Sequence, residues 1–149
     1  MTYKHTQPGT WLLIFFAIAA SLIIFSQGGI TVNSSWIALV ILVPASVIFS
    51  SQTIKIDQGS LIWHFGLGFW KKQLALTDIV SAEAVRNKWY YGLGIRYTPR
   101  GWLYAVSGLD AVEIQKQDGS TFRLGTNEPE TLQAAIQQHI AQRSEPQII

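Results

Sequence analysis

Residues 112–124 read VEIQKQDGSTFRL, and this stretch has the pattern of a β-hairpin. Apolar and polar residues alternate from Val112 to Gln115 and again from Thr121 to Leu124. Successive side chains of a strand point to opposite faces, so the alternation predicts two strands that each bury one face. Asp118-Gly119 supplies the residue types that a tight hairpin turn prefers. The stretch therefore predicts an antiparallel sheet with one face against a core.

Shorter runs with the same alternation precede this hairpin. They are separated by Gly, Asp, Asn, Ser and Pro residues, which are typical of turns, and they lie at about residues 53–57, 61–65, 70–76, 78–86, 94–97 and 102–106. Together with residues 112–124 they predict about seven or eight antiparallel strands. We expect these strands to form one strongly bent sheet or open barrel.

The sheet region is followed by a helical pattern. Leu132, Ile136 and Ile140 recur every four residues, which predicts a helix with one apolar stripe from about residue 128 to residue 142. Residues 51–142 should therefore form one α+β domain with a C-terminal helix, and residues 143–149 should form a flexible tail.

The amino-terminal third of the chain has a different composition. Residues 11–26 read WLLIFFAIAASLIIFS and residues 36–50 read WIALVILVPASVIFS, and neither run carries a charge. Such runs favour lipid hydrocarbon over water, and the uncharged stretch between them has the composition of a loop. We expect residues 1–50 to form an N-terminal transmembrane hairpin with spans at about 11–27 and 36–50.

Two alternatives to a transmembrane hairpin follow from the same residues. A cleaved signal peptide is one, because Ala17-Ile18-Ala19 fits a small-residue cleavage pattern. A pair of buried core helices is the other, although helices that are apolar all round would be hard for so small a domain to cover. In the transmembrane interpretation, Lys4 before the first run and Lys55 after the second place both termini and the domain in the cytoplasm.

Composition and spacing favour no catalytic or metal chemistry. A formal net charge of +2 is too small to indicate a nucleic-acid partner, and the chain has no cysteine for disulfides or thiolate ligands. His5, His64 and His139 have no acidic or histidine neighbour at metal-ligand spacing. We therefore expect a protein that is not an enzyme, with no catalytic residues, no cofactor, no metal and no nucleic-acid partner.

A stretch rich in cations and aromatic residues is the candidate contact surface. Its members are Lys88, Trp89, Tyr90, Arg96, Arg100 and Trp102. Beside a bilayer, Lys and Arg would attract anionic headgroups, and Trp and Tyr would settle in the interface. The alternative is that the aromatic residues are core-packing residues whose neighbouring cations reach water.

The same region carries a family resemblance. The residues WYYGLGIRY at 89–97, GWLY at 101–104, VSG at 106–108 and GTNEP at 125–129 resemble those of bacterial pleckstrin-homology-like domain proteins. The resemblance covers about residues 51–142 and implies two bent sheets closed at one end by a helix, beside membrane helices. It implies a protein integral to the bacterial plasma (inner) membrane, and it brings no catalytic assignment.

The functional expectation follows from these features together. We expect a membrane-anchored, nonenzymatic binding or scaffold module that holds its domain at the cytoplasmic membrane surface. Its partners would be the lipid bilayer, anionic lipid headgroups or another membrane protein. The alternative is a protein-interaction subunit of a larger membrane complex that does not recognise lipid.

Overall fold

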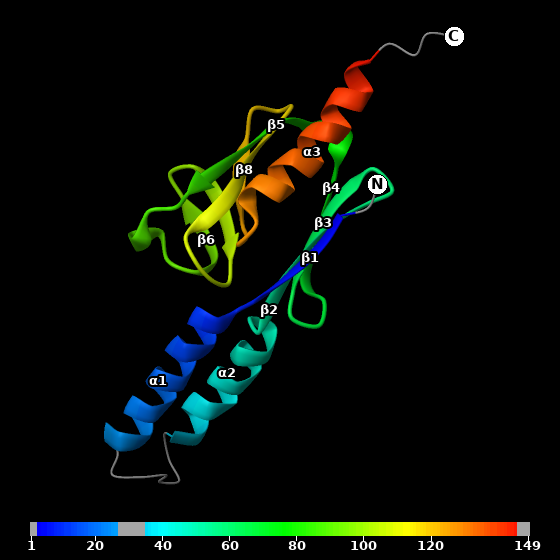
Figure 1. Cartoon of the computed structure of the whole chain (residues 1–149). Helices are drawn as coiled ribbons and strands as arrows, with labels where there is room; N and C mark the ends of the chain where they lie inside the picture. Colours follow the sequence, from blue (N-terminus) through cyan, green and yellow to red (C-terminus); the bar gives the residue numbers. More distant parts are fainter. Residues whose placement is uncertain (1–2, 27–34, 146–149) are drawn as a thin grey trace.

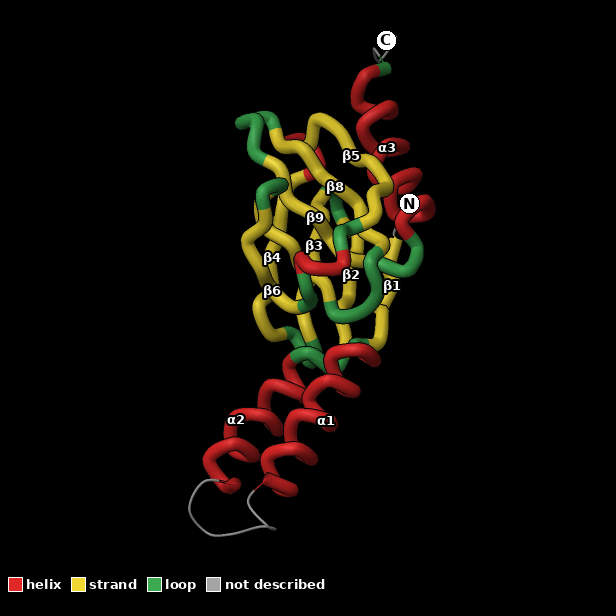
Figure 2. The backbone as a smooth tube through the Cα atoms, turned by 90° about the vertical axis from the view of Figure 1, so that its left-hand side faces the viewer, coloured by secondary structure: helices red, strands yellow, loops and turns green. Residues whose placement is uncertain are grey.

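The computed structural model describes residues 3–26 and 35–145 of the chain, and it shows a body of two β-sheets from which a pair of helices projects (Figure 1). The loop expected between the two apolar runs lies, apart from Ser35, outside the described residues. Most of the expected tail, residues 146–149, also lies outside them. Figure 2 shows that the two helices continue from one end of the sheet body.

The first sheet has four antiparallel strands in the order β1-β2-β3-β4. They are β1 (Tyr3–Pro8), β2 (Ser51–Asp57), β3 (Ser60–Phe65) and β4 (Phe69–Ala75). The β2–β3 turn has positive φ at both Gln58 and Gly59, the geometry of a two-residue turn that matches the twist of the flanking strands. This hairpin confirms the turn predicted at these residues.

The second sheet has five strands in the order β5-β8-β9-β7-β6. They are β5 (Ile79–Arg86), β6 (Gly94–Thr98), β7 (Gly101–Ala105), β8 (Asp110–Lys116) and β9 (Thr121–Gly125). Strands β8 and β9 pair antiparallel as residues 112–124 predict, whereas β7 and β9 pair in parallel. Two short 3-10 helices, η1 (Leu76–Asp78) and η2 (Trp89–Tyr91), flank β5.

Three α-helices complete the described structure: α1 (Thr10–Ser26), α2 (Ser35–Ile48) and α3 (Pro129–Ser144). Helix α3 packs against β5 and β8, and its Leu132 and Ile136 are fully buried. At the β5 edge, the backbone N–H of Ala84 donates to Gln133 Oε1 at 2.7 Å, and Gln137 Nε2 donates to the Ala82 carbonyl at 3.0 Å. Helix α3 therefore satisfies edge groups of β5 that would otherwise lack a strand partner.

The core lies between the two sheets and under α3. It is formed by alternate residues of both sheets together with the buried stripe of α3, and its fully buried members include Leu61, Phe65, Val112, Ile114 and Leu124. Across the core, Trp63 from the first sheet stacks on Phe122 from the second, with ring centroids 5.1 Å apart. This aromatic contact joins the two sheets.

The expected single bent sheet or open barrel is wrong. The described strands form two separate sheets with no closed barrel between them, and β7–β9 breaks the antiparallel pattern. Strand β1 was not predicted, because residues 3–8 have few apolar residues and end in Pro8. It forms because it lies on the free edge of β2, with Tyr3 opposite Ile56 and Pro8 opposite Ser51, and an edge position tolerates proline.

The expected transmembrane hairpin is also wrong. Within residues 3–26 and 35–145, no helix combines the length and the apolar character needed to cross a bilayer. Helices α1 and α2 have 17 and 14 residues, which at about 1.5 Å per residue is about 25 Å and about 21 Å. The hydrocarbon core of a bilayer is about 30 Å thick. The spans at about 11–27 and 36–50 and the expected place in the bacterial inner membrane are corrected accordingly.

Candidate functional site

The aromatic–cationic surface, defined as Lys88, Trp89, Tyr90, Arg96, Arg100 and Trp102, lies around η2 and the β6–β7 hairpin. The Trp89 side chain is 80% exposed, and those of Tyr90 and Trp102 are about half exposed. These three aromatic residues therefore lie at the surface, and the alternative that they pack in the core does not describe them.

Each cation of this surface is placed by a local contact. Lys88 Nζ lies 5.7 Å from the centroid of the Tyr90 ring, a cation–π distance, and hydrogen bonding with the Tyr90 side chain raises the pKa of Lys88 above its usual value. Arg96 Nε donates to the Leu93 carbonyl at 2.7 Å. Arg100 lies in the β6–β7 turn, where its backbone N–H donates to Thr98 Oγ1 at 3.2 Å.

A hollow of about 760 Å³ lies among these residues. Lys88, Tyr90, Arg96 and Arg100 line it, together with neighbours from β6. None of the described residues that line it is acidic, so the three cations face the hollow without a carboxylate beside them. Such an arrangement attracts anions. Trp89 and Trp102 do not line this hollow.

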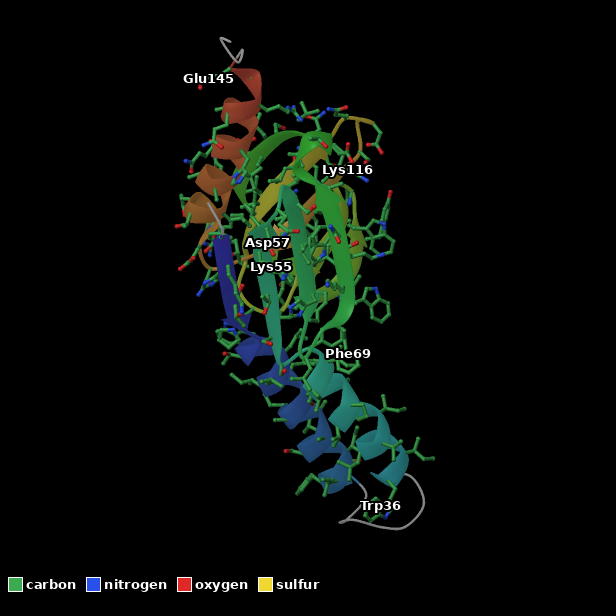
Figure 3. The ribbon with its side chains drawn as sticks, turned by 90° about the vertical axis from the view of Figure 1, so that its right-hand side faces the viewer. Trp36, Lys55, Asp57, Phe69, Lys116 and Glu145 are labelled. Atoms are coloured by element: carbon green, nitrogen blue, oxygen red, sulfur yellow. The ribbon has the colours of Figure 1, made fainter. Side chains whose placement is uncertain are left out.

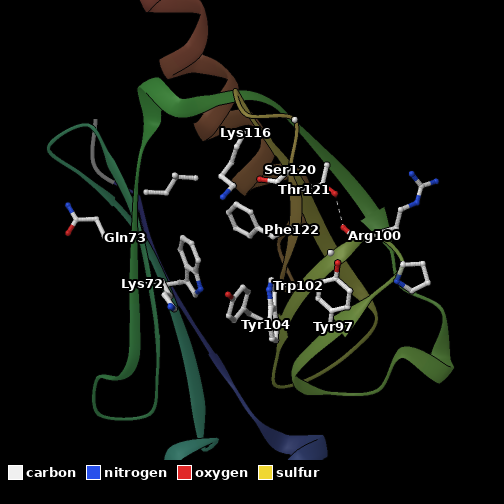
Figure 4. A pocket seen from close by; sticks show the side chains of 15 residues that line it. Lys72, Gln73, Tyr97, Arg100, Trp102, Tyr104, Lys116, Ser120, Thr121 and Phe122 are labelled. Carbon is white, nitrogen blue, oxygen red and sulfur yellow. Dashed lines mark hydrogen bonds between the residues drawn. The ribbon is translucent and has the colours of Figure 1, made fainter.

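Trp102 instead lines a second hollow, the inter-sheet cleft, where the two sheets diverge (Figure 4). The inter-sheet cleft has a volume of about 680 Å³. The side chains that matter for its chemistry are Trp63, Lys72, Tyr97, Trp102, Lys116 and Phe122. Arg100 contributes to both hollows, but Figure 4 shows its guanidinium group directed away from Lys72 and Phe122.

Sequence reasoning missed the inter-sheet cleft. Lys72, Lys116 and Trp63 come from β4, β8 and β3, and no local spacing connects them. The register of the strands places Trp63 opposite Lys72 and Phe122 opposite Trp102, and Lys116 lines the cleft from the end of β8. Since opposite residues share a face of a sheet, these pairs line the two facing walls.

The third surface feature is the apolar helix pair, defined as α1 and α2. Six large apolar side chains are exposed on each helix: Trp11, Ile14, Phe15, Ile18, Leu22 and Phe25 on α1, and Trp36, Ile37, Val40, Ile41, Val43 and Val47 on α2. Phe25 is 85% exposed. No residue of α1 is buried. Figure 3 shows the pair extending away from the sheets, with Trp36 at the far end. An exposed apolar surface of this extent marks an interaction site.

The described residues contain no candidate metal-binding cluster. No group of three or more His, Cys, Asp or Glu side chains among residues 3–26 and 35–145 lies close enough to hold a metal ion. His5 is engaged instead at the start of α3, with its Nε2 2.6 Å from Asn127 Oδ1 and its Nδ1 3.4 Å from Glu128 Oε2. This contact joins β1 to the helix.

Comparison of the sequence with known protein families and curated proteins identifies no relative. No model of a known protein family matches the chain, and no curated protein matches it. The resemblance of residues 51–142 to bacterial pleckstrin-homology-like domain proteins is therefore corrected: no family match supports it, and the membrane helices that it implies are not formed by any described helix.

Proposed function

We propose that this chain is a nonenzymatic binding module that contacts anionic lipid headgroups through its aromatic–cationic surface. The observation that carries the proposal is the hollow beside η2, where Lys88, Arg96 and Arg100 converge with no acidic side chain among the described lining residues. Lipid phosphates and carboxylates supply the negative charge that these cations favour. The exposed Trp89 and Tyr90 rings suit the boundary between headgroups and acyl chains.

The expected strength of the contact between the three cations and anionic headgroups shows whether a further contribution to binding is needed. Each Lys or Arg near an anionic membrane surface contributes about 1 kcal/mol, so three give about 3 kcal/mol. A dissociation constant of about 1 mM already corresponds to about 4 kcal/mol. The cations alone therefore give weak, reversible binding, and useful affinity requires an apolar contribution from the same molecule.

The apolar helix pair is the available apolar contribution. Its exposed side chains would gain about 25 cal/mol for each Å² of apolar surface removed from water. In this proposal the pair lies against the lipid surface with no segment crossing it. Specific headgroup contacts and nonspecific apolar contacts would then act together.

Vesicle binding by the full chain tests the proposal. Co-sedimentation would compare vesicles of phosphatidylcholine with vesicles that also contain phosphatidylglycerol, at low and high salt. Preference for the anionic vesicles should fall as salt rises, because screening weakens exposed charge interactions. Equal binding to both vesicle types at every salt concentration would contradict the proposal.

Matched variants separate the proposed surface from overall charge. Lys88→Gln/Arg100→Gln should lower the preference for anionic vesicles about thirtyfold if each cation contributes about 1 kcal/mol under the assay conditions. Lys4→Gln/Lys55→Gln removes the same charge from opposite positions on β1 and β2 and should have a smaller effect. Equal losses in the two double variants would show that only net charge matters.

A second candidate function rests on the apolar helix pair alone. The twelve exposed large apolar side chains of α1 and α2 could pack against apolar helices of a protein partner, making the chain a protein-interaction subunit without lipid recognition. Helix packing buries apolar ridges in grooves and needs no charge. In this case the chain would bind neutral and anionic vesicles equally. Substitutions on α1 or α2 would release a copurifying protein partner, whereas Lys88→Gln/Arg100→Gln would not.

A further inference from the structure

We propose that the inter-sheet cleft is a binding site for a small organic anion with an aromatic body, such as an aryl carboxylate. This inference goes beyond the lipid-binding proposal, because its central residues, Lys72, Lys116 and Trp63, lie outside the aromatic–cationic surface. The cleft volume of about 680 Å³ lies within the range of about 300–1,000 Å³ that is usual for small-molecule sites.

Aromatic side chains from both sheets form the walls of the cleft. Trp63 and Phe122, which come from the two opposite walls, stack on each other and are largely buried. At the mouth, Tyr97 and Trp102 meet edge to face with centroids 5.4 Å apart, and the Tyr97 side chain is 75% exposed. Exposed rings fixed by a neighbouring ring offer a flat apolar surface at little entropic cost. A planar aromatic body fits these walls.

Lysines give the cleft its charge preference. Lys72 and Lys116 line it, and none of the described lining residues is acidic. Lys72 makes no ion pair among the described residues. Lys116 Nζ lies 3.8 Å from Asp118 Oδ2, but that carboxylate is also bonded by the backbone N–H of Ser120 at 2.8 Å. An acidic ligand would therefore meet two lysines and no opposing lining carboxylate.

Unsatisfied hydrogen-bonding capacity also lies at the cleft. Trp63 is only 5% exposed, and its Nε1–H has no hydrogen-bond partner among the described residues. Burial raises the pKa of the neighbouring Tyr104 phenol, so this hydroxyl keeps its proton and remains able to donate. Buried donors without acceptors are unusual in folded proteins. An oxygen of an acidic ligand would supply the acceptor that the Trp63 Nε1–H lacks.

The experiment titrates the full chain with 2-naphthoate and with its neutral analogue 2-naphthamide, by isothermal titration calorimetry. We expect saturable binding of 2-naphthoate at one site and markedly weaker binding of 2-naphthamide. The neutral analogue has nearly the same aromatic body, so it accounts for nonspecific contact with the apolar helix pair. Equal affinity for the two probes, or no saturable binding of 2-naphthoate, would overturn the proposal.

Variants locate the site. Lys72→Gln and Lys116→Gln should each weaken 2-naphthoate binding about threefold to fivefold, the effect of one partly exposed charge pair. Lys71→Gln, the neighbouring lysine on β4 that does not line the cleft, should leave binding unchanged. Trp63→Phe should weaken binding while the circular dichroism spectrum stays that of the parent chain. An equal effect of Lys71→Gln and Lys72→Gln would contradict the assignment.

A vesicle assay keeps this inference separate from the proposed function. Lys72→Gln/Lys116→Gln should retain the preference for anionic vesicles, whereas Lys88→Gln/Arg96→Gln, which removes two cations that line only the hollow beside η2, should retain 2-naphthoate binding. Loss of both activities in both double variants would show that the two hollows are not independent sites, and it would overturn the cleft as a separate site.

Discussion

Arg123 and Glu113 face each other on β9 and β8, and two nitrogens of one guanidinium, Nε and Nη2, each lie 2.8 Å from the same carboxylate oxygen, Glu113 Oε2. The third nitrogen, Arg123 Nη1, donates to Asn87 Oδ1 at 2.9 Å. Arg123 is only 8% exposed. This contact therefore ties the β8–β9 hairpin to the segment that leads into η2.

The pair predicts a marked loss of stability when its carboxylate is removed. Glu113→Ala should lower the free energy of unfolding by about 3 kcal/mol, because it leaves a mostly buried guanidinium without its counter-charge. Arg86→Gln, which removes the exposed pair with Asp110, should lower it by less than about 1 kcal/mol. Urea denaturation measures both values. Similar losses in the two variants would contradict the distinction between the buried and exposed pairs.

Gly9 lies at the junction between the sheets and the apolar helix pair, where a larger side chain should lower stability. Its N–H donates to the Ser50 carbonyl at 2.8 Å, and a Cβ added to Gly9 would lie 2.0 Å from the Phe49 carbonyl oxygen. Gly9→Ala must therefore separate the start of α1 from the chain leaving α2. We expect a loss of about 1–3 kcal/mol in thermal or urea unfolding, as for other forced overpacking. Unchanged stability would show that the junction can open without loss.

Tyr3 predicts a loss of stability at alkaline pH. Its hydroxyl donates to Glu128 Oε2 at 3.3 Å, and burial together with the Glu128 charge raises the pKa of Tyr3 from 10.0 to about 12. A raised pKa means that the folded state favours the protonated phenol. This contribution is fully present below pH 10.0 and is lost as the pH rises towards about 12.

Tyr3→Phe measures this contribution. Urea unfolding of both chains at about pH 9 and about pH 11.5 should show a smaller loss with pH in Tyr3→Phe, because that variant has no phenol to ionise. The difference between the chains should lie in the slope with pH and not only in the stability at one pH. Parallel pH dependences would mean that the contact of Tyr3 with Glu128 contributes nothing.

Substitutions on the exposed side of the apolar helix pair should weaken association with a binding partner without lowering the stability of the fold. Leu22 and Val40 are 63% and 69% exposed, so Leu22→Gln and Val40→Gln should change the free energy of unfolding by no more than about 0.5 kcal/mol. Both should reduce binding to vesicles, measured by co-sedimentation, because each removes part of an exposed apolar surface. Leu12, which packs against the core, is the contrasting position: Leu12→Ala should lower stability by about 1 kcal/mol or more.

Local pattern was enough for several elements. The hairpins β2–β3, β6–β7 and β8–β9 form where alternation and turn residues predict them, and α3 follows the apolar repeat of Leu132 and Ile136. A two-residue turn dictates which strand pairs next, and a helical repeat dictates which side is buried. These relations are decided by neighbours in the chain, so the sequence alone determined them.

The candidate site divides in the same way. Lys88, Tyr90, Arg96 and Arg100 are close in sequence, and the structure gathers them around one hollow. Their exposure could not be predicted, because a Trp–Tyr stretch is equally suited to a core and to a surface. The apolar composition of α1 and α2 was visible in the sequence, but it favoured spans whose length the helices do not reach.

Tertiary structure alone decided how the strands divide into two sheets, the parallel β7–β9 pair, the position of β1 beside β2, and the presence of both Lys72 and Lys116 in the lining of the inter-sheet cleft. Alternation tells which face of a strand is buried but not which distant strand lies beside it. That choice depends on how well whole surfaces pack and on which backbone groups remain unpaired. Strand pairings between distant segments therefore cannot be predicted from local sequence patterns.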